Sequence, residues 1–194
     1  DGDIEKPNLG ISAADMAVLQ KTITHVIHCA ASVAFDDPYD LSFQANVVGS
    51  QNALSFSLQL QEAPGSPFVA HLSVETSYIH GRQTRQLARE DEVVFPRNFY
   101  NNYYELTKAM ASLETERFMF EHKLRVVQLC PSIVIGQAKT GNNRGDQKVV
   151  NAPINAWGRA RKLVTESQGH WVRRSQAEVL TRLARVFPGH PTAE

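Results

Sequence analysis

The sequence predicts an α/β fold in which helices cover a parallel sheet, the doubly wound arrangement. Short apolar, β-branched segments alternate with longer segments of helical periodicity, which is the pattern of such a sheet. Hydrophobic residues make up 42% of the 194 positions, enough for a buried core. No apolar segment approaches the roughly 20 residues that cross a bilayer. We therefore expect a globular chain without a membrane span.

The first helix is predicted over residues 12–22. Ser12 precedes it as an N-cap, Asp15 follows three residues later, and apolar residues recur on one face. A buried strand is predicted next, over residues 25–30. A longer helix follows over residues 40–60, because its apolar residues recur at roughly helical spacing, and a segment with Pro and Gly ends it.

The same alternation continues. A strand is predicted over residues 68–73, a helix over 103–122 and a strand over 124–130, which a proline ends. Residues 132–135 either continue this strand or form a short fourth one. The polar segment 81–102 is too long and too charged for a simple turn, and such loops often carry function.

The composition changes after Gly136. Two basic amphipathic stretches follow, at residues 154–164 and 175–186, and each is predicted to be helical. We therefore expect two domains, residues 1–136 and residues 137–194, of which the second is helical.

The charge balance limits the partners. Lys plus Arg and Asp plus Glu number 20 each, so no net charge attracts the chain to nucleic acid or to an anionic membrane. A small molecule or another protein is the expected partner.

The cysteines and histidines suggest no metal site. Cys29 and Cys130 lie far apart in apolar segments, with neither disulfide nor metal-ligand spacing. We expect both to be small core residues in a reduced, cytoplasmic setting, and not covalent catalysts. His25 and His28, three apart on a strand, point to opposite faces. All seven histidines are interpreted as structural or surface residues.

A phenol and an ammonium stand together at the start of the helix predicted over 103–122. Tyr104 and Lys108 are four residues apart, so they share one helix face. A phenol with a pKa of about 10 is a poor acid–base catalyst at neutral pH, and a nearby cation favours its ionised form. The pair therefore suits proton transfer, although an exposed Tyr and Lys would give the same pattern.

Hydroxyl residues follow the strand predicted over 68–73. Ser73, Thr76 and Ser77 lie where that strand ends. Their hydroxyls can donate hydrogen bonds to a carbonyl oxygen that gains negative charge. Ordinary turn chemistry places Ser and Thr there as well.

In this order, the strand-end hydroxyls, the Tyr-x-x-x-Lys helix and the PSIVIG segment of residues 131–136 resemble the extended short-chain dehydrogenases/reductases, which have a Rossmann-like fold. Three further segments fit the family: GDI at residues 2–4, HCAA at 28–31 and NVVGS at 46–50. HVIHCAASVAFDDP, NVVGSQNAL and PSIVIG most resemble the thioester-reductase and fatty acyl reductase branch, also called the male-sterility NAD-binding domain. The resemblance covers roughly residues 1–155.

The resemblance implies an NADP-dependent oxidoreductase, with NAD not excluded, that reduces a CoA- or carrier-bound acyl thioester to an aldehyde or alcohol. Tyr104 would protonate the carbonyl oxygen as hydride arrives, and Lys108 would lower the pKa of Tyr104 and bind the nicotinamide ribose. Thr76, five residues before Gly81, falls where the family carries its Ser or Thr. Asn46 would hold a water or backbone group in a proton path, or only pack its helix. The other residues implied at the cofactor are Asp3, Ile4, Cys29, Ala30, Ala31, Pro131, Ser132 and Ile133.

The resemblance also implies what is missing. The family opens with a strand and a Gly-rich turn that sets pyrophosphate at a helix N-terminus. This sequence has no such turn, so we expect the first phosphate-binding βαβ unit to be absent and the substrate-binding region at 137–194 to be partial. Basic residues there would meet carrier phosphates or lie solvated on helix faces: Arg144, Lys148, Arg159, Arg161 and Lys162.

Two alternatives stay open. The first is a sugar-nucleotide epimerase or reductase that uses Tyr104 and Lys108 in the same way. The second is a truncated chain that only binds a partner and catalyses nothing. The resemblance also leaves room for a homodimer.

Overall fold

The computed structural model describes residues 1–83, 87–142 and 150–166, with only the backbone given for 163–166. The chain divides into two compact units, Asp1–Ser132 and Ile133–Glu194.

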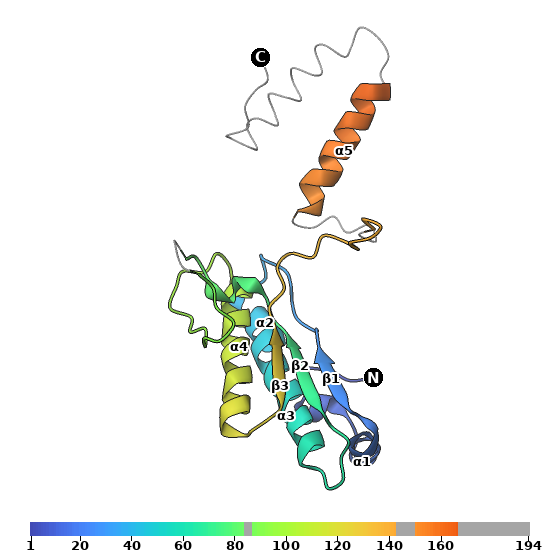
Figure 1. The fold of residues 1–194 in the computed structure, drawn as a ribbon, viewed down its shortest axis with the longest axis vertical. Helices are drawn as coiled ribbons and strands as arrows, with labels where there is room; N and C mark the ends of the chain where they lie inside the picture. The colour runs from blue at the N-terminus through green and yellow to red at the C-terminus, as the bar shows by residue number, and fades with distance from the viewer. Residues whose placement is uncertain (84–86, 143–149, 167–194) are drawn as a thin grey trace. The chain divides into compact units, whose positions relative to one another are not determined.

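Of the second unit, the structure describes one helix, α5 (Asn151–Glu166) (Figure 1). It includes the first predicted amphipathic stretch, whereas the second, at 175–186, lies outside the described residues, as do Arg144 and Lys148. The predicted domain limits at residue 136 remain a prediction. No helix in the described ranges is both long and apolar enough to cross a bilayer.

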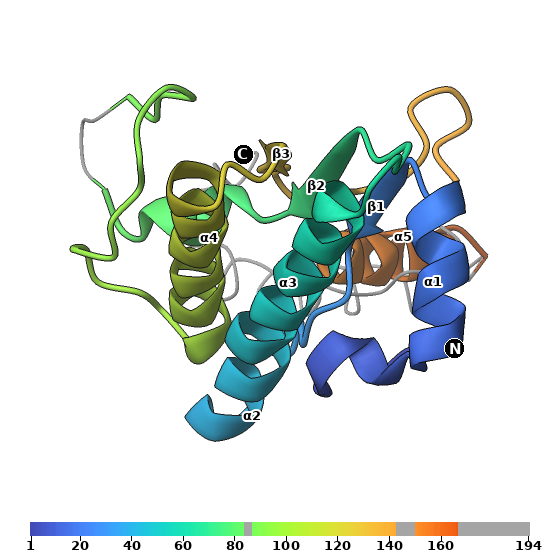
Figure 2. The same cartoon turned by 90° about the horizontal axis from the view of Figure 1, so that it is seen from below.

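The first unit is built on a three-stranded parallel sheet, which confirms the predicted fold class. Its strands are hydrogen-bonded in chain order: β1 (His25–His28), β2 (Ala70–Val74) and β3 (Val126–Leu129). The helices α1 (Ala13–Thr22), α3 (Gly49–Glu62) and α4 (Tyr103–Glu121) lie on one face of this sheet (Figure 2).

The predicted helices form, with one change. Ser12 caps α1 as predicted, since its Oγ accepts a hydrogen bond from the Asp15 N–H at 3.1 Å. The helix predicted over 40–60 is one continuous run of three pieces: α2 (Tyr39–Phe43), a π-helical turn η2 (Gln44–Val48), and α3. Short 3-10 turns, which the sequence analysis does not predict, lie at η1 (Pro7–Gly10) and η3 (Ser77–His80).

The apolar core lies where the strands begin and α3 and α4 end. Burial of these side chains is the main stabilising contribution in this part of the molecule. Its buried members are Met16, Leu54, Phe56, Leu60, Phe68, Phe118 and Leu124.

Three predictions about the strands are wrong. β1 ends at His28 and is not buried: within the described part of the first unit it is an edge strand with helices on one face only, and Ile27 is 65% exposed. Cys29 and Cys130 follow the strands and are exposed, so neither is a core residue. Residues 132–135 form no strand.

Side chains alternate between the two faces of the sheet. The helix-covered face carries a polar row across all three strands, because His28, Ser73 and Gln128 are aligned in register. The other face is apolar: Ile27, Val127 and Leu129 are all exposed. The covered side therefore holds polar groups at the carboxyl ends of the strands.

Candidate active site

Local hydrogen bonds fix the start of α4, which carries the predicted catalytic pair. Asn102 caps the helix: its Oδ1 accepts a hydrogen bond from the Glu105 N–H at 2.9 Å. The buried Glu105 carboxylate in turn accepts one from the Asn101 N–H at 2.9 Å. A carboxylate in the first turn also interacts favourably with the positive end of the helix dipole. The backbone that carries Tyr104 is thus held in place.

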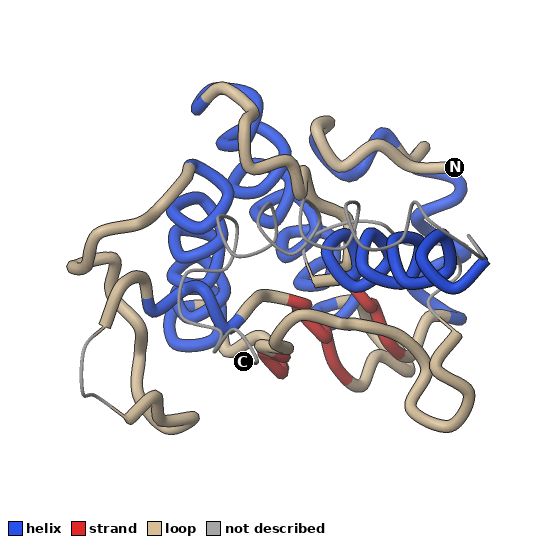
Figure 3. Tube along the Cα trace, turned by 90° about the horizontal axis from the view of Figure 1, so that it is seen from above, coloured by secondary structure: helices blue, strands red, loops and turns tan. Residues whose placement is uncertain are grey.

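The polar segment 81–102 leads the chain to this cap. It contains no helix or strand among its described residues (tan in Figure 3). It begins at Gly81, whose φ of 64° favours glycine, and a Cβ there would lie 3.0 Å from the Phe99 carbonyl oxygen. The Arg82 N–H donates to that carbonyl at 2.9 Å, and the Tyr100 hydroxyl donates to the Ile79 carbonyl at 2.8 Å. The loop therefore folds back along η3.

Thr76 lies close enough to Tyr104 for its side chain to act on the pKa of the phenol. Thr76 is buried directly after β2, where its Oγ1 accepts a hydrogen bond from the Tyr78 N–H at 3.3 Å. Tyr104 is half-buried, with its ring 5.5 Å from that of Phe35. The two side chains therefore lie near one another at the carboxyl edge of the sheet, and their catalytic roles remain predictions.

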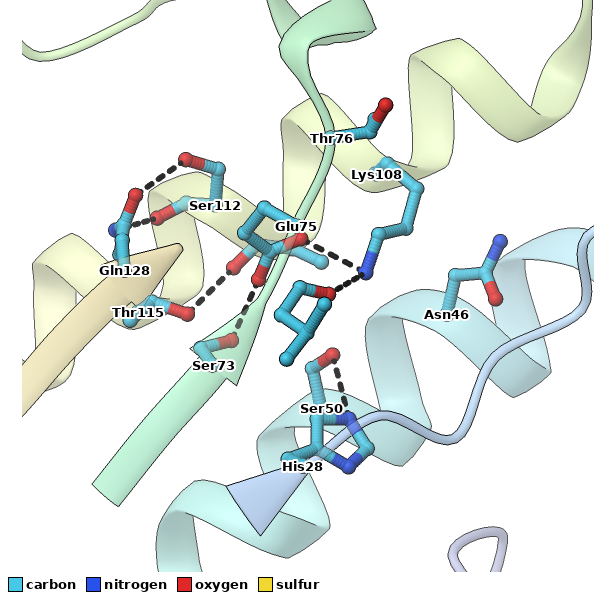
Figure 4. A network of polar contacts seen from close by, with 12 residues as sticks. His28, Asn46, Ser50, Ser73, Glu75, Thr76, Lys108, Ser112, Thr115 and Gln128 are labelled. Atoms are coloured by element: carbon cyan, nitrogen blue, oxygen red, sulfur yellow. Dashed lines mark hydrogen bonds and ion pairs between the residues drawn. The ribbon is translucent and has the colours of Figure 1, made fainter. Parts of the chain in front are cut away.

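Lys108 lies one turn further along α4, and its side chain is only 4% exposed. Its Nζ donates a hydrogen bond to the Val74 carbonyl at 2.8 Å and lies 2.9 Å from Oε2 of Glu75 (Figure 4). The Glu75 side chain is fully buried, and its Oε1 accepts a hydrogen bond from the Ser73 hydroxyl at 2.6 Å. The ammonium is therefore part of a buried ion pair.

The pKa of Tyr104 is raised in this structure. Burial of the phenol is the first cause, although the Thr76 side chain acts to lower the pKa. Glu75, Tyr78 and Glu105 raise it further. The Lys108 ammonium lies against Val74 and Glu75, and its expected lowering of the Tyr104 pKa remains a prediction.

Asn46 joins two elements of the site. It is buried in η2, a π-helical turn of the kind often found at functional sites. Its Oδ1 accepts from the Ser32 N–H at 2.8 Å, and its Nδ2 donates to the Ser32 carbonyl at 3.1 Å and to Thr107 Oγ1 at 3.0 Å. Asn46 therefore holds a backbone group after β1 against α4, and its place in a proton path remains a prediction.

One of the predicted cofactor residues, Ile4, lies against the start of α3. The Ile4 carbonyl accepts a hydrogen bond from Asn52 at 2.8 Å, and a Cβ on Gly49 would lie 3.0 Å from the Ile4 side chain. Asp3 is exposed and pairs with Lys6 at 3.2 Å. Within the described residues, no hydrogen bond or ion pair is found between Asp3 or Ile4 and the Thr76–Tyr104 pair.

The remaining cofactor residues follow two strands. Cys29 and Ala30 are exposed and Ala31 is half-buried directly after β1. The Pro131 carbonyl, just after β3, accepts a hydrogen bond from the Ser77 N–H at 3.1 Å. Ser132 ends the first unit and Ile133 opens the second.

The Cys130 thiol is not activated as a nucleophile in this structure. The pKa of the Cys130 thiol is raised, first by the atoms that crowd it although the residue is exposed, and then by the Glu75 carboxylate. A raised pKa leaves little thiolate, which is the nucleophilic form. The described residues also contain no group of three His, Cys, Asp or Glu side chains that could hold a metal ion.

Sequence reasoning missed Glu75 as a member of the site. The available signal was a carboxylate at the end of an apolar strand, at a position where the resembled family has a small hydroxyl residue. His71 was also missed as part of the polar interior. It is fully buried, its Nδ1 lies 2.7 Å from the Ser57 hydroxyl, and burial, followed by the nearby His28, lowers its pKa to about 4.

Comparison with known proteins shows the family of this chain. A family of NAD-binding domains, described as Male sterility protein, matches residues 1–169. The hybrid PKS-NRPS synthetase ucsA of Acremonium sp is 27% identical over 136 residues, which cover 70% of this chain and 3% of that protein. The probable fatty acyl-CoA reductase 4 of Arabidopsis thaliana is 26% identical over 128 residues, which cover 66% of this chain and 24% of that protein.

A solved structure supports the same assignment. The terminal R domain from the myxalamid PKS-NRPS biosynthetic pathway is 26% identical, with a TM-score of 0.63 over 79% of this chain and 37% of that chain. The chain thus spans only a part of each relative, at most 24% of the two curated proteins. Because the family match covers most of the chain, the chain belongs to the male sterility protein family, in the thioester-reductase branch of the Rossmann-type extended short-chain dehydrogenases/reductases.

Proposed function

We propose that this chain carries the catalytic residues of an NADP-dependent reductase that converts a CoA- or carrier-bound acyl thioester to an aldehyde. The observation that carries the proposal is the placement of Tyr104 beside Thr76 at the carboxyl edge of a parallel sheet, with Lys108 one turn further along α4. Open α/β sheets bind their ligands at this edge.

The residues present suit the nicotinamide end of a dinucleotide. Small, exposed residues follow β1 at Cys29 and Ala30, so the backbone there is accessible to a ligand. Lys108 supplies the cation that would bind the ribose hydroxyls. When bound, the cofactor supplies hydride to the carbonyl carbon. NADP is chosen from the family resemblance, and NAD would use the same residues.

The side chains have separate tasks in this proposal. Thr76 holds the carbonyl oxygen of the thioester, and Tyr104 donates its proton to that oxygen. The Tyr104 phenol is protonated at neutral pH, as a proton donor requires, and its raised pKa makes it a weaker acid than an ordinary phenol in the free chain. As the C–S bond breaks, the hydroxyl that Tyr104 protonated gives up its proton to the sulfur, so the carbonyl re-forms as the aldehyde and the sulfur leaves as the thiol of the carrier. Asn46 keeps the segment after β1 in position.

The names of two relatives support the substrate class. One is a probable fatty acyl-CoA reductase, and the other is the terminal R domain of a PKS-NRPS pathway. Arg159, Arg161 and Lys162 are exposed on α5, and their contact with carrier phosphates remains a prediction. Further reduction to an alcohol would use the same residues.

A fluorescence titration of NADPH into the full chain tests the cofactor. Saturable binding is expected, weakened by Lys108→Ala and largely spared by Tyr104→Phe, because the ammonium contacts the ribose whereas the phenol acts on the substrate. Failure of the folded chain to bind NADPH would overturn the proposal for this chain.

An acyl-CoA assay tests the reaction. NADPH consumption and aldehyde formation are followed together, and Tyr104→Phe should lower the rate by roughly 10²–10⁴-fold because it removes the acid. Tyr103→Phe is the matched control, since Tyr103 is the neighbouring phenol and is 50% exposed. An altered hexose from a nucleotide sugar, without aldehyde from the thioester, would favour the epimerase instead.

A further inference from the structure

The ion pair between Glu75 and Lys108 joins the end of β2 to α4, but burying its two charges carries a high free-energy cost of desolvation. Both side chains are almost completely buried, at 0% and 4% exposure. Removing two charges from water can cost more than their attraction returns, and apolar residues of similar volume often replace such a pair without loss of stability. The packing of this region therefore does not by itself explain the pair.

The geometry of the pair is asymmetric. The ammonium makes its hydrogen bond to the Val74 carbonyl, at 2.8 Å. Glu75 Oε2 lies 2.9 Å from the same Nζ, a close ion-pair distance. The carboxylate is held from its other side, where the Ser73 hydroxyl donates to Oε1. The ammonium is therefore held between a backbone carbonyl and a carboxylate that Ser73 fixes in place.

Glu75 faces both members of the proposed catalytic pair. The titratable groups that act on Tyr104 are Glu75 after β2, Tyr78 in η3 and Glu105 on α4. Those that interact with Lys108 are Glu75, His28 at the end of β1 and Cys130 after β3. Glu75 is common to the two sets.

We propose that Glu75 is a positioning residue that holds the Lys108 ammonium under the Val74 carbonyl, away from Tyr104, until the ribose hydroxyls of a bound dinucleotide take up the ammonium. This inference rests on the proposed function. Glu75 balances the charge of Lys108 in the free chain, so the phenol of Tyr104 stays an acid. On cofactor binding, the ammonium would exchange the Val74 carbonyl for the ribose hydroxyls, and Glu75 would still balance its charge.

The direct test is a titration of the Tyr104 phenol, followed by phenolate absorbance in the near ultraviolet. Subtracting the curve of Tyr104→Phe isolates this phenol from the other four tyrosines. Glu75→Gln should lower the pKa of Tyr104 by about one unit, because a carboxylate that raises it is lost and the charge of Lys108 is no longer balanced.

A double-mutant comparison shows whether Glu75 acts through Lys108. The same Glu75→Gln change is made in a Lys108→Met background, where no ammonium remains. The pKa shift should be clearly smaller there. Equal Tyr104 pKa shifts in the two backgrounds, or no shift in either background, would overturn the proposal. If Glu75 only packed, Glu75→Gln would not change the pKa of Tyr104 in either background.

Ser73→Ala covers the case in which Glu75→Gln does not fold. This change removes the hydrogen bond to Oε1 and leaves the carboxylate in place. A smaller shift in the same direction is expected, and an unchanged Tyr104 titration in the folded variant would overturn the proposal.

NADPH titration of the same samples separates this inference from the proposed function. A Tyr104 shift without NADPH binding would count against the cofactor and would support the control of Lys108 by Glu75. Normal NADPH binding with an unchanged Tyr104 titration would support the cofactor and would overturn the control of Lys108 by Glu75.

Discussion

The two ends of the helix-covered face of the sheet differ sharply in chemistry. Where the strands begin, the space under the helices is filled by apolar side chains such as Leu54, Leu60 and Phe118. Where the strands end, the same layer holds His28, Ser73 and the pair of Glu75 and Lys108. Apolar burial stabilises the first end, whereas each group at the second end needs a specific partner. One end therefore sustains the fold, and the other places reactive groups.

The largest expected effect comes from opening the apolar end. Leu60→Ala removes a fully buried side chain, and the resulting cavity should lower the free energy of unfolding by about 2–5 kcal/mol. Denaturant unfolding followed by the near-UV circular dichroism of tyrosine measures this, because all five tyrosines lie in the first unit. Leu41→Ala is the control, since Leu41 is 57% exposed. A Tyr104 pKa that moved in Leu60→Ala would contradict the separation of the two ends.

The next effect belongs to the polar end and depends on pH. Burial lowers the pKa of His71 from 6.5 to about 4. Between these two pH values, His71 therefore binds a proton in the unfolded chain but not in the folded chain. The free energy of unfolding is therefore highest above pH 6.5, and it decreases by about 3 kcal/mol in total as the pH falls toward 4.

Denaturant titrations across this pH range measure the loss. His71→Gln should flatten the dependence of the unfolding free energy on pH, and His25→Gln, at an exposed position of β1, should leave it as it is. An equally steep dependence in His71→Gln would assign the effect to another group.

The smallest effect compares two helix caps. Ser12 caps α1 beside the apolar core, and Asn102 caps α4 beside Tyr104. Replacing either by Ala should lower the free energy of unfolding by about 1 kcal/mol. Only Asn102→Ala should also change the phenolate titration of Tyr104, because it loosens the turn that carries the phenol. Equal titration curves in the two variants would show that the cap does not position the site.

Most of the fold was predictable because local patterns specify it. The periodicity of residues 12–22 and 103–122, together with the Ser12 cap, predicts α1 and α4 within one or two residues at each end. The exposure of β1 was not predictable in this way. An apolar run is the same in a central and in an edge strand, and only the tertiary arrangement places Ile27 at an uncovered face.

The site was predictable where it depends on spacing along one element. Tyr104 and Lys108 share a helix, and Thr76 follows a strand whose neighbours meet it at one edge. Their partners were not predictable, because contacts between Lys108 and Glu75 or between Asn46 and Ser32 join residues that are distant in sequence. The direction of the Tyr104 pKa shift in this structure depends on these distant contacts, so the spacing along α4 could not predict it.

The π-helical turn η2 (Gln44–Val48) changes the direction in which side chains point around the axis of one continuous helix. A π turn accommodates one more residue than an α turn, so the helix before it and the helix after it are out of step by one position, about 100° of rotation. This offset lets Asn46 face Ser32 and Thr107 while Leu54 and Leu60 face the apolar core. A deletion of a single residue here would restore a regular helix, and α3 could then keep its core face or Asn46 could keep its partners, but not both.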